Sequence, residues 1–185
     1  MIQISNIITD AELLQMSVQN PELRFERNAD GTLMTMPPTG RISSNREIKA
    51  GAYLLNWVEA NNLGEVFSST ARFKLPNSAI RSPDAAFVSK QRLPQDWNQG
   101  EDDFLNLAPD FIIEIRSKSD SLTKLQQKME EYRENGVKLG WLIDPQNQQA
   151  FVYRQDGSVT QYPGDAILSG EDVVPGFTLA LKVLL

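Results

Sequence analysis

The chain has 185 residues and a net charge of −6, and 41% of its residues are hydrophobic. These values are typical of an ordinary globular protein, and we expect one domain over residues 1–185. The sequence contains no His and no Cys. This excludes disulfides, thiolate nucleophiles, the usual zinc sites and a His general base, so any chemistry must use carboxylates, Lys, Arg, Tyr, Ser or Thr.

Charge and hydropathy also restrict the partners and the location of the protein. A pI near 4.8 argues against a protein that coats nucleic acid nonspecifically, although it is compatible with a local basic site. No segment approaches the ~18 consecutive apolar residues of a membrane span. The N-terminus lacks the basic start and apolar run of a signal peptide. We therefore expect a soluble, cytoplasmic protein.

The first elements expected along the chain are a short helix, a hairpin and a long helix. Thr9 and Asp10 can cap the short helix. Residues 25–36 predict a hairpin turned at Asp30-Gly31, after which residues 37–40 break the chain. The long helix is expected from Ser43 or Ser44 to about Asn61. Its predicted apolar face comprises Ile48, Ala52, Leu55 and Val58 or Glu59.

The remaining elements predict a sheet with a further helix. Apolar or alternating runs at 65–70, 71–75, 84–89 and 111–115 are typical of strands. A helix is expected from Ser119-Asp120 to Asn135-Gly136. Its apolar face comprises Leu122, Leu125, Met129 and Tyr132. Three strands should follow, at 139–143, 150–154 and 159–162. This order predicts an α/β (α+β) fold, in which helices flank a mixed sheet.

Charged residues are unevenly spread through the middle of the chain. Residues 71–92 contain five basic residues and one acid, whereas residues 93–110 contain five acids and no base. The Pro, Gly, Asn and Gln content of the acidic stretch predicts a loop. A solvated surface and a functional role explain these two stretches equally well.

Glu114 is the first candidate for a functional residue, because it interrupts the apolar run of residues 111–115. Strand alternation places it on the same face as Ile112, opposite its other apolar neighbours. Burying an unpaired carboxylate costs several kcal/mol, so we expect Glu114 to be paired, metal-bound or part of an active site. A structural ion pair or an edge-strand Glu facing water is the alternative.

Asp84 is the second candidate, since it follows Pro83 at the start of another apolar strand. Alone, a Pro-Asp pair is most often a turn or a cap. If the two strands are neighbours, the carboxylates of Asp84 and Glu114 can hold one divalent cation, whose charge offsets their repulsion. An all-oxygen ligand set favours a hard cation such as Mg or Mn.

A lysine would complete a phosphodiester-cleaving site by stabilising negative charge or steering the attacking water. The position two residues after Glu114 is Arg116, so the nearby candidates are Lys118, Lys124 and Lys128. On its helix, Lys128 lies nearer the apolar face than Lys124 does. A solvated helix lysine is the alternative.

Motifs along most of the chain resemble those of a large family of bacterial proteins, often called Uma-type, in the PD-(D/E)xK restriction-endonuclease-like superfamily. The resemblance includes Met36-Pro37-Pro38-Thr39-Gly40, Ile80-Arg81-Ser82-Pro83-Asp84, Pro109-Asp110-Phe111-Ile112-Ile113-Glu114-Ile115, Lys128-Met129 and Gly140-Trp141-Leu142-Ile143-Asp144-Pro145.

The resemblance implies a restriction-endonuclease-like core with additional N-terminal and C-terminal strands. Asp84 would be the Asp of the PD element and Glu114 the acidic residue of the (D/E)xK element. The sequence departs from the pattern at Arg116, which stands at the usual Lys position, and Lys128 on the following helix is the natural substitute. Glu26, which the family also matches, would add a carboxylate to the site or form a surface ion pair with Arg27.

The leading hypothesis is an endonuclease that hydrolyses DNA phosphodiester bonds with Mg (or Mn). The metal would be held by Asp84, Glu114 and the carbonyl of Ile115, while Lys128 helps to position water for in-line attack. The DNA backbone would contact Arg72, Lys74 and Arg81. The alternatives are a catalytically silent module that binds nucleic acid or a protein, and an unrelated α+β binding protein whose acidic pair is structural.

A homodimer is also expected. The strands at 150–154 and 159–162, with Trp141 and Tyr153 nearby, offer an apolar surface for self-association. In addition, cutting both strands of a duplex suits two-fold symmetry.

Overall fold

A computed structural model describes residues 7–36, 39–99 and 103–185 of the chain. Of the predicted segments, Pro37 and Pro38 in the break after the hairpin lie outside the described residues, as do residues 100–102 of the acidic loop.

The elements follow the predicted order closely. The N-terminal half contains α1 (Asp10–Gln19), β1 (Arg24–Arg27), β2 (Leu33–Met36), α2 (Arg41–Ala60), β3 (Gly64–Ser68), β4 (Phe73–Lys74), β5 (Ile80–Arg81) and β6 (Ala85–Ser89). The C-terminal half contains β7 (Phe111–Ile115), α3 (Leu122–Glu134), β8 (Leu139–Asp144), β9 (Gln149–Arg154), β10 (Val159–Pro163), β11 (Ile167–Ser169), β12 (Thr178–Ala180) and the 3-10 helix η1 (Leu181–Val183). The short strands β5, β11 and β12 and the helix η1 were not among the residue ranges predicted from the sequence.

Local chemistry explains where the first elements begin and turn. The backbone N–H of Glu12 donates to the hydroxyl of Thr9, and the Glu12 carboxylate accepts from the Thr9 N–H, which forms a capping box at the start of α1. The β1–β2 hairpin turns through Gly31, whose φ of 86° is a conformation that glycine adopts without strain.

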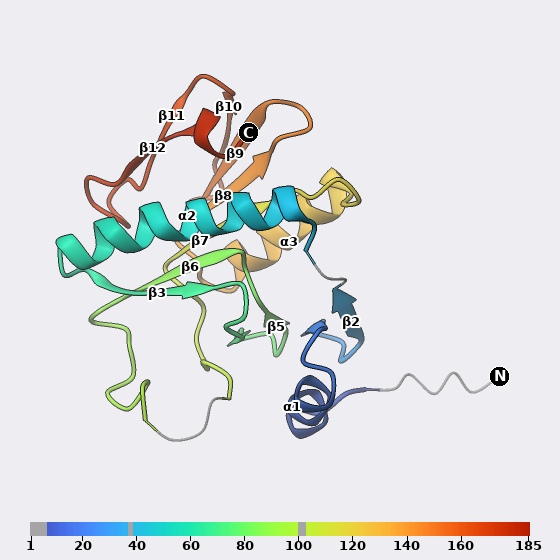
Figure 1. Cartoon of the computed structure of the whole chain (residues 1–185). Coiled ribbons are helices and arrows are strands. Elements are labelled where there is room, and N and C mark those ends of the chain that lie inside the picture. The colour runs from blue at the N-terminus through green and yellow to red at the C-terminus, as the bar shows by residue number, and fades with distance from the viewer. Residues whose placement is uncertain (1–6, 37–38, 100–102) are drawn as a thin grey trace.

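The centre of the molecule is a six-stranded mixed sheet with the order β10-β9-β8-β7-β6-β3 (Figure 1). The β7–β8 pair is parallel, and the other neighbours are antiparallel. Helix α2 packs on one face, where its buried side chains join Phe111 and Ile113, and α3 packs on the other face against Ile112 and Leu142. This arrangement confirms the predicted mixed sheet flanked by helices.

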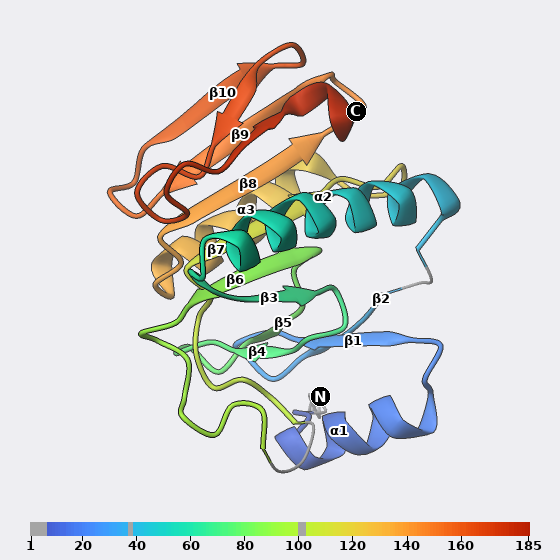
Figure 2. The ribbon, with the colours of Figure 1, turned by 60° about the vertical axis from the view of Figure 1, so that its left-hand side comes forward.

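A second sheet with the order β2-β1-β5-β4 lies next to α1, away from β9 and β10 (Figure 2). A small core joins its strands to α1 through Leu13, Phe25 and Ile80. Strand β5 also precedes β6 by only a few residues. The second sheet is therefore attached beside the end of the central sheet at which β6 begins.

The apolar face predicted for α2 is wrong except at Val58, which is buried. Ile48 is 67% exposed and Leu55 is 37% exposed, whereas the buried residues of α2 are Ala50, Leu54 and Val58. These three follow each other at intervals of four residues, so they also form one helical face. The helix contains two stripes of similar hydrophobicity, and packing against the sheet selects the stripe that begins with the small Ala50. The helix also begins earlier than expected, after Gly40.

The face predicted for α3 is confirmed. Met129 and Tyr132 are buried, and Leu122 and Leu125 pack at the edge of the same cluster. Ser121 caps this helix, because its hydroxyl accepts from the backbone N–H of Lys124.

The apolar surface that suggested a homodimer is not present, because Trp141 and Tyr153 are almost completely buried. Trp141 stacks on Phe177, which comes from the C-terminal segment that covers this part of the sheet. The homodimer stays a prediction that rests on substrate symmetry alone. No helix in the part of the chain that the structure describes is long and apolar enough to cross a membrane.

Candidate active site

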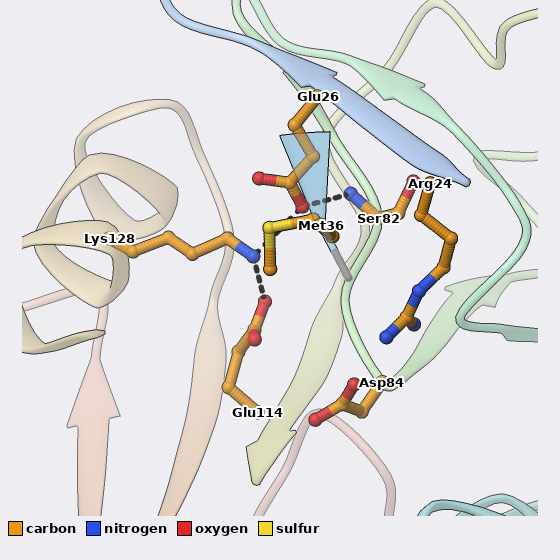
Figure 3. Close-up of a pocket in the computed structure, with 7 residues that line it drawn as sticks. All are labelled: Arg24, Glu26, Met36, Ser82, Asp84, Glu114 and Lys128. Atoms are coloured by element: carbon orange, nitrogen blue, oxygen red, sulfur yellow. Dashed lines mark hydrogen bonds and ion pairs between the residues drawn. The ribbon is translucent and has the colours of Figure 1, made fainter. Parts of the chain in front are cut away.

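A small pocket opens where β1, β6, β7 and α3 approach each other (Figure 3). Its volume is about 20 Å³. This is enough for one water-sized occupant. The residues that line it are Arg24, Glu26, Met36, Ser82, Asp84, Glu114 and Lys128.

Strand pairing brings the two candidate carboxylates together. Strands β6 and β7 are antiparallel, with Ala85 opposite Ile113, so Asp84 at the start of β6 lies beside the end of β7 that carries Glu114. The backbone N–H of Ile115 donates to Asp84 Oδ2 at 2.7 Å. Because the N–H and C=O of one strand residue point to the same side, the carbonyl of Ile115 also faces the side of Asp84.

Glu114 is 5% exposed and lies on the face of β7 that packs against α3, as the alternation predicted. Its Oε1 accepts from the hydroxyl of Tyr132 at 3.0 Å and is 2.8 Å from the Lys128 ammonium. Burial raises the pKa of Glu114 even though the charge of Lys128 opposes this rise. Burial also raises the pKa of Asp84 well above its ordinary value, and the negative charge of Glu114 adds to the rise.

Lys128 bridges two carboxylates from different parts of the fold. Its ammonium is 2.8 Å from Glu114 Oε1 and 2.9 Å from Glu26 Oε1. Burial alone would lower the pKa of Lys128, but the charges of Glu114 and Glu26 outweigh it and raise the pKa above its ordinary value. The lysine is therefore a fixed positive charge, unsuited to act as a general base. Lys124 is exposed, as its position on the helix predicted.

Glu26 is the second carboxylate that pairs with Lys128. It comes from β1, is 2% exposed, and accepts from the backbone N–H of Ser82 at 3.0 Å. Burial favours its neutral form, yet the charges of Lys128 and Arg81 hold the pKa of Glu26 below its ordinary value. The alternative of a surface pair between Glu26 and Arg27 is wrong, because Arg27 instead pairs with Asp10.

Comparison with known proteins places the chain in a family and finds a solved structure with a similar fold. Residues 10–182 match the family described as "Uma2: Putative restriction endonuclease". The chain belongs to the Uma2 family. Its fold is similar to the crystal structure of a putative nuclease belonging to DUF820 from Anabaena variabilis ATCC 29413, with a TM-score of 0.76, 24% identity, and coverage of 86% of this chain and 88% of that one. No curated protein matches the sequence. The Uma2 match supports a nuclease-type function, and the DUF820 neighbour shows the fold.

Arg116, at the position where the superfamily pattern has lysine, points away from the pocket of this Uma2 protein. Its guanidinium donates to Asp144 Oδ1 at 3.1 Å and to the carbonyl of Asp120 at 3.0 Å. Asp144 is fully buried and is the last residue of β8, which lies on the side of β7 opposite β6. Arg116 therefore does not supply the positive side chain of the site, and Lys128 is the basic residue that contacts Glu114.

The three basic residues predicted to contact phosphate do not converge on the pocket. Arg81 is buried and uses its guanidinium inside the protein, at 2.6 Å from Glu131 Oε2 and 3.4 Å from Glu26 Oε2. Lys74 pairs with Asp10, and Arg72 lies 5.4 Å from the ring centre of Phe104.

Sequence reasoning missed Arg24, which lines the pocket above Asp84 (Figure 3). Its guanidinium donates to the hydroxyl of Thr39 at 2.7 Å. The signal that was available is its place in the strand that carries Glu26, since residues 24 and 26 of one strand share a face.

The donor set fits a hard divalent cation. Asp84, Glu114 and the carbonyl of Ile115 supply oxygen ligands, and the raised pKa values of the two acids indicate negative charge that the protein alone does not neutralise. Within residues 7–36, 39–99 and 103–185, no group of three or more acidic side chains is placed to hold a metal. Glu26 does not join the pair, because it is turned to Lys128 and Arg81.

Proposed function

We propose that the protein is a Mg- or Mn-dependent endonuclease that hydrolyses phosphodiester bonds of DNA. The observation that carries the proposal is the convergence of Asp84, Glu114 and Lys128 in one buried pocket. Asp84, Glu114 and the Ile115 carbonyl would hold the ion. When bound, the ion would supply a Lewis acid and positive charge against the phosphate.

The side chains of the protein have separate tasks in this proposal. The Tyr132 hydroxyl and the Ile115 N–H orient Glu114 and Asp84, so neither carboxylate needs to reorganise. Lys128 directs a permanent positive charge into the pocket, where negative charge develops on the phosphate oxygens during attack. Arg24 at the pocket rim is placed to contact the neighbouring phosphate.

The test is Mg-dependent cleavage of plasmid, branched and single-stranded DNA by wild-type protein, with Asp84→Asn and Asp165→Asn compared under the same salt. Both substitutions remove one carboxylate charge, but Asp165 is exposed and outside the pocket. We expect cleavage by the wild type and by Asp165→Asn, and none by Asp84→Asn. Absence of cleavage on every substrate would favour the silent binding module, which is the alternative that the net charge of −6 supports.

A further inference from the structure

A groove of about 780 Å³ adjoins the candidate active site and has no role in the function proposed above. It is bounded by the end of α1, by β1, by the segment from β3 to β4, and by the loop between β6 and β7. Arg24 and Ser82 line both the groove and the small pocket. A ligand in the groove would therefore reach the pocket directly.

We infer that this groove binds an unpaired DNA strand and leads its backbone to the pocket of Asp84, Glu114 and Lys128. The inference rests on the proposed nuclease function and specifies its substrate class. Three properties of the described residues support it: the charge of the groove lining, its aromatic side chains, and its size.

The charged side chains of the groove favour a polyanion. Arg24 and Arg72 line it, with Asp103 as the one acid among its described lining residues. This local balance is positive, although the chain as a whole carries −6. The exposed hydroxyls of Ser68 and Thr70 are hydrogen-bonded to each other at 2.9 Å, which leaves one O–H of the pair to donate to a phosphate oxygen. Positive charge along a groove is the general means by which proteins follow a nucleic-acid backbone.

Aromatic side chains favour bases that are not paired. Trp97 and Phe67 line the groove, and their ring centres are 5.7 Å apart in an edge-to-face arrangement. Trp97 is partly exposed, so part of its indole is accessible to a ligand. Bases stack on aromatic side chains when they are free of a duplex, whereas the bases of a duplex already stack on each other.

The dimensions of the groove agree with this substrate. Its volume lies in the range of pockets that enclose drug-sized ligands, roughly 300–1,000 Å³, which suits about one or two nucleotides. The active-site pocket beyond it holds only about 20 Å³. A strand entering along the groove would present a phosphate to the pocket without inserting a base there. A single-stranded substrate would also remove the symmetry argument for a homodimer.

The first measurement is DNA affinity without metal, which keeps binding separate from catalysis. Fluorescence anisotropy in EDTA would compare a labelled 12-nucleotide single strand, the blunt duplex of the same sequence and the equivalent RNA. We expect the DNA strand to bind about tenfold more tightly than the duplex and no more weakly than the RNA. Equal or tighter binding of the duplex, or tighter binding of the RNA, would overturn the inference.

Substitutions then locate the bound strand. Trp97→Ala should weaken single-strand binding about tenfold and Arg72→Gln severalfold, whereas Trp97→Phe should retain it. Lys90→Gln is the charge control, because Lys90 is exposed and follows β6, at the end of the strand opposite to Asp84. Single-stranded DNA should also quench tryptophan fluorescence in the wild type but not in Trp97→Phe. Unchanged affinity in Trp97→Ala, with a wild-type melting temperature, would overturn the inference.

The two proposals fail in different ways. Metal-dependent cleavage that prefers intact duplex would retain the nuclease and remove the groove inference. Conversely, Trp97-dependent binding of single strands without cleavage of any substrate would retain the groove as a single-strand site and remove the proposed catalysis.

Discussion

The two ends of strand β7 lie beside acidic side chains that behave in opposite ways. Asp110, just before β7, is 1% exposed and accepts from the Ser89 N–H at 2.8 Å, from Arg92 at 2.9 Å and from Lys138 at 2.8 Å. Burial favours its neutral form, but these partners outweigh burial and lower the pKa of Asp110. At the other end of β7, burial raises the pKa values of Asp84 and Glu114.

The difference distinguishes a structural carboxylate from a functional one. Two positive side chains and a backbone N–H compensate the single charge of Asp110. Among the described residues, Asp84 has one hydrogen-bond partner, the Ile115 N–H, and Glu114 shares Lys128 with Glu26. Uncompensated negative charge in a buried cleft is costly for folding, and it is what a cation-binding site requires. We therefore assign Asp110 to stability and the Asp84–Glu114 pair to function.

The largest effect should follow from removing the lysine charge. Lys128→Met keeps the apolar stem, and we expect DNA cleavage to fall by about two to three orders of magnitude, as for loss of one group that stabilises transition-state charge. Lys124→Met is the matched control on the same helix and should have little effect. Rates are measured with Mg under identical salt, and full activity in Lys128→Met would remove this residue from the site.

The Lys128 variant must be compared as folded protein. Removing the ammonium leaves Glu26 and Glu114 without their shared partner, and loss of one member of a buried pair costs about 3–5 kcal/mol. Thermal unfolding should therefore precede the assay, which is run well below the melting temperature of the variant.

A smaller effect is expected in the acid dependence of stability. Because the pKa of Asp110 is lower in the folded state, the unfolded state binds more protons as the solution is acidified. The stabilisation is complete well above the ordinary pKa of 3.8 and is lost as pH falls through the lowered pKa. Urea unfolding between pH 7 and about pH 3 should show a weaker acid loss in Asp110→Asn. An identical loss in both proteins would contradict the structural assignment of Asp110.

The smallest effect expected is stabilisation by the metal. An ion that binds only the folded state at about ten times its Kd adds roughly 1.4 kcal/mol, which is about 3–6 °C in melting temperature for a chain of this size. Mg or Mn should raise the melting temperature of the wild type and not that of Asp84→Asn. If millimolar metal gives neither a shift in melting temperature nor a heat of binding, the proposal that the pocket binds a divalent cation is wrong.

Much of the fold could be predicted because local signals agree with it. Caps, turn residues and periodicity located α1, the β1–β2 hairpin and α3 within a few residues. The face of α2 could not be predicted, because its two apolar stripes differ only in what they pack against. Strand β5 is two residues long and has no periodicity of its own.

The site was predictable where strand order determines it and less so elsewhere. Glu114 was singled out because an acid within an apolar strand is costly, and Asp84 because it follows Pro83 at the start of another apolar strand. The ion pairs of Glu26 and Arg81 depend on the second sheet packing against α3, which joins residues far apart in sequence. For the same reason, Arg81 was expected at a phosphate, whereas its charge is used inside the protein.

The assignment of Asp110 to stability and of Asp84 to function is tested most directly by urea unfolding of Asp84→Asn and Asp110→Asn at pH 7 in EDTA. Both variants replace a carboxylate, buried at Asp110 and partly buried at Asp84, by an amide of the same shape. The account predicts opposite outcomes: Asp110→Asn should lose about 1–2 kcal/mol in free energy of unfolding, since Arg92 and Lys138, whose side chains are 33% and 44% exposed, lose their charged partner but stay partly solvated. Asp84→Asn should be at least as stable as the wild type, because it removes a charge that burial disfavours. A comparable loss in Asp84→Asn would show that its carboxylate is structural, and would contradict the assignment of the pocket.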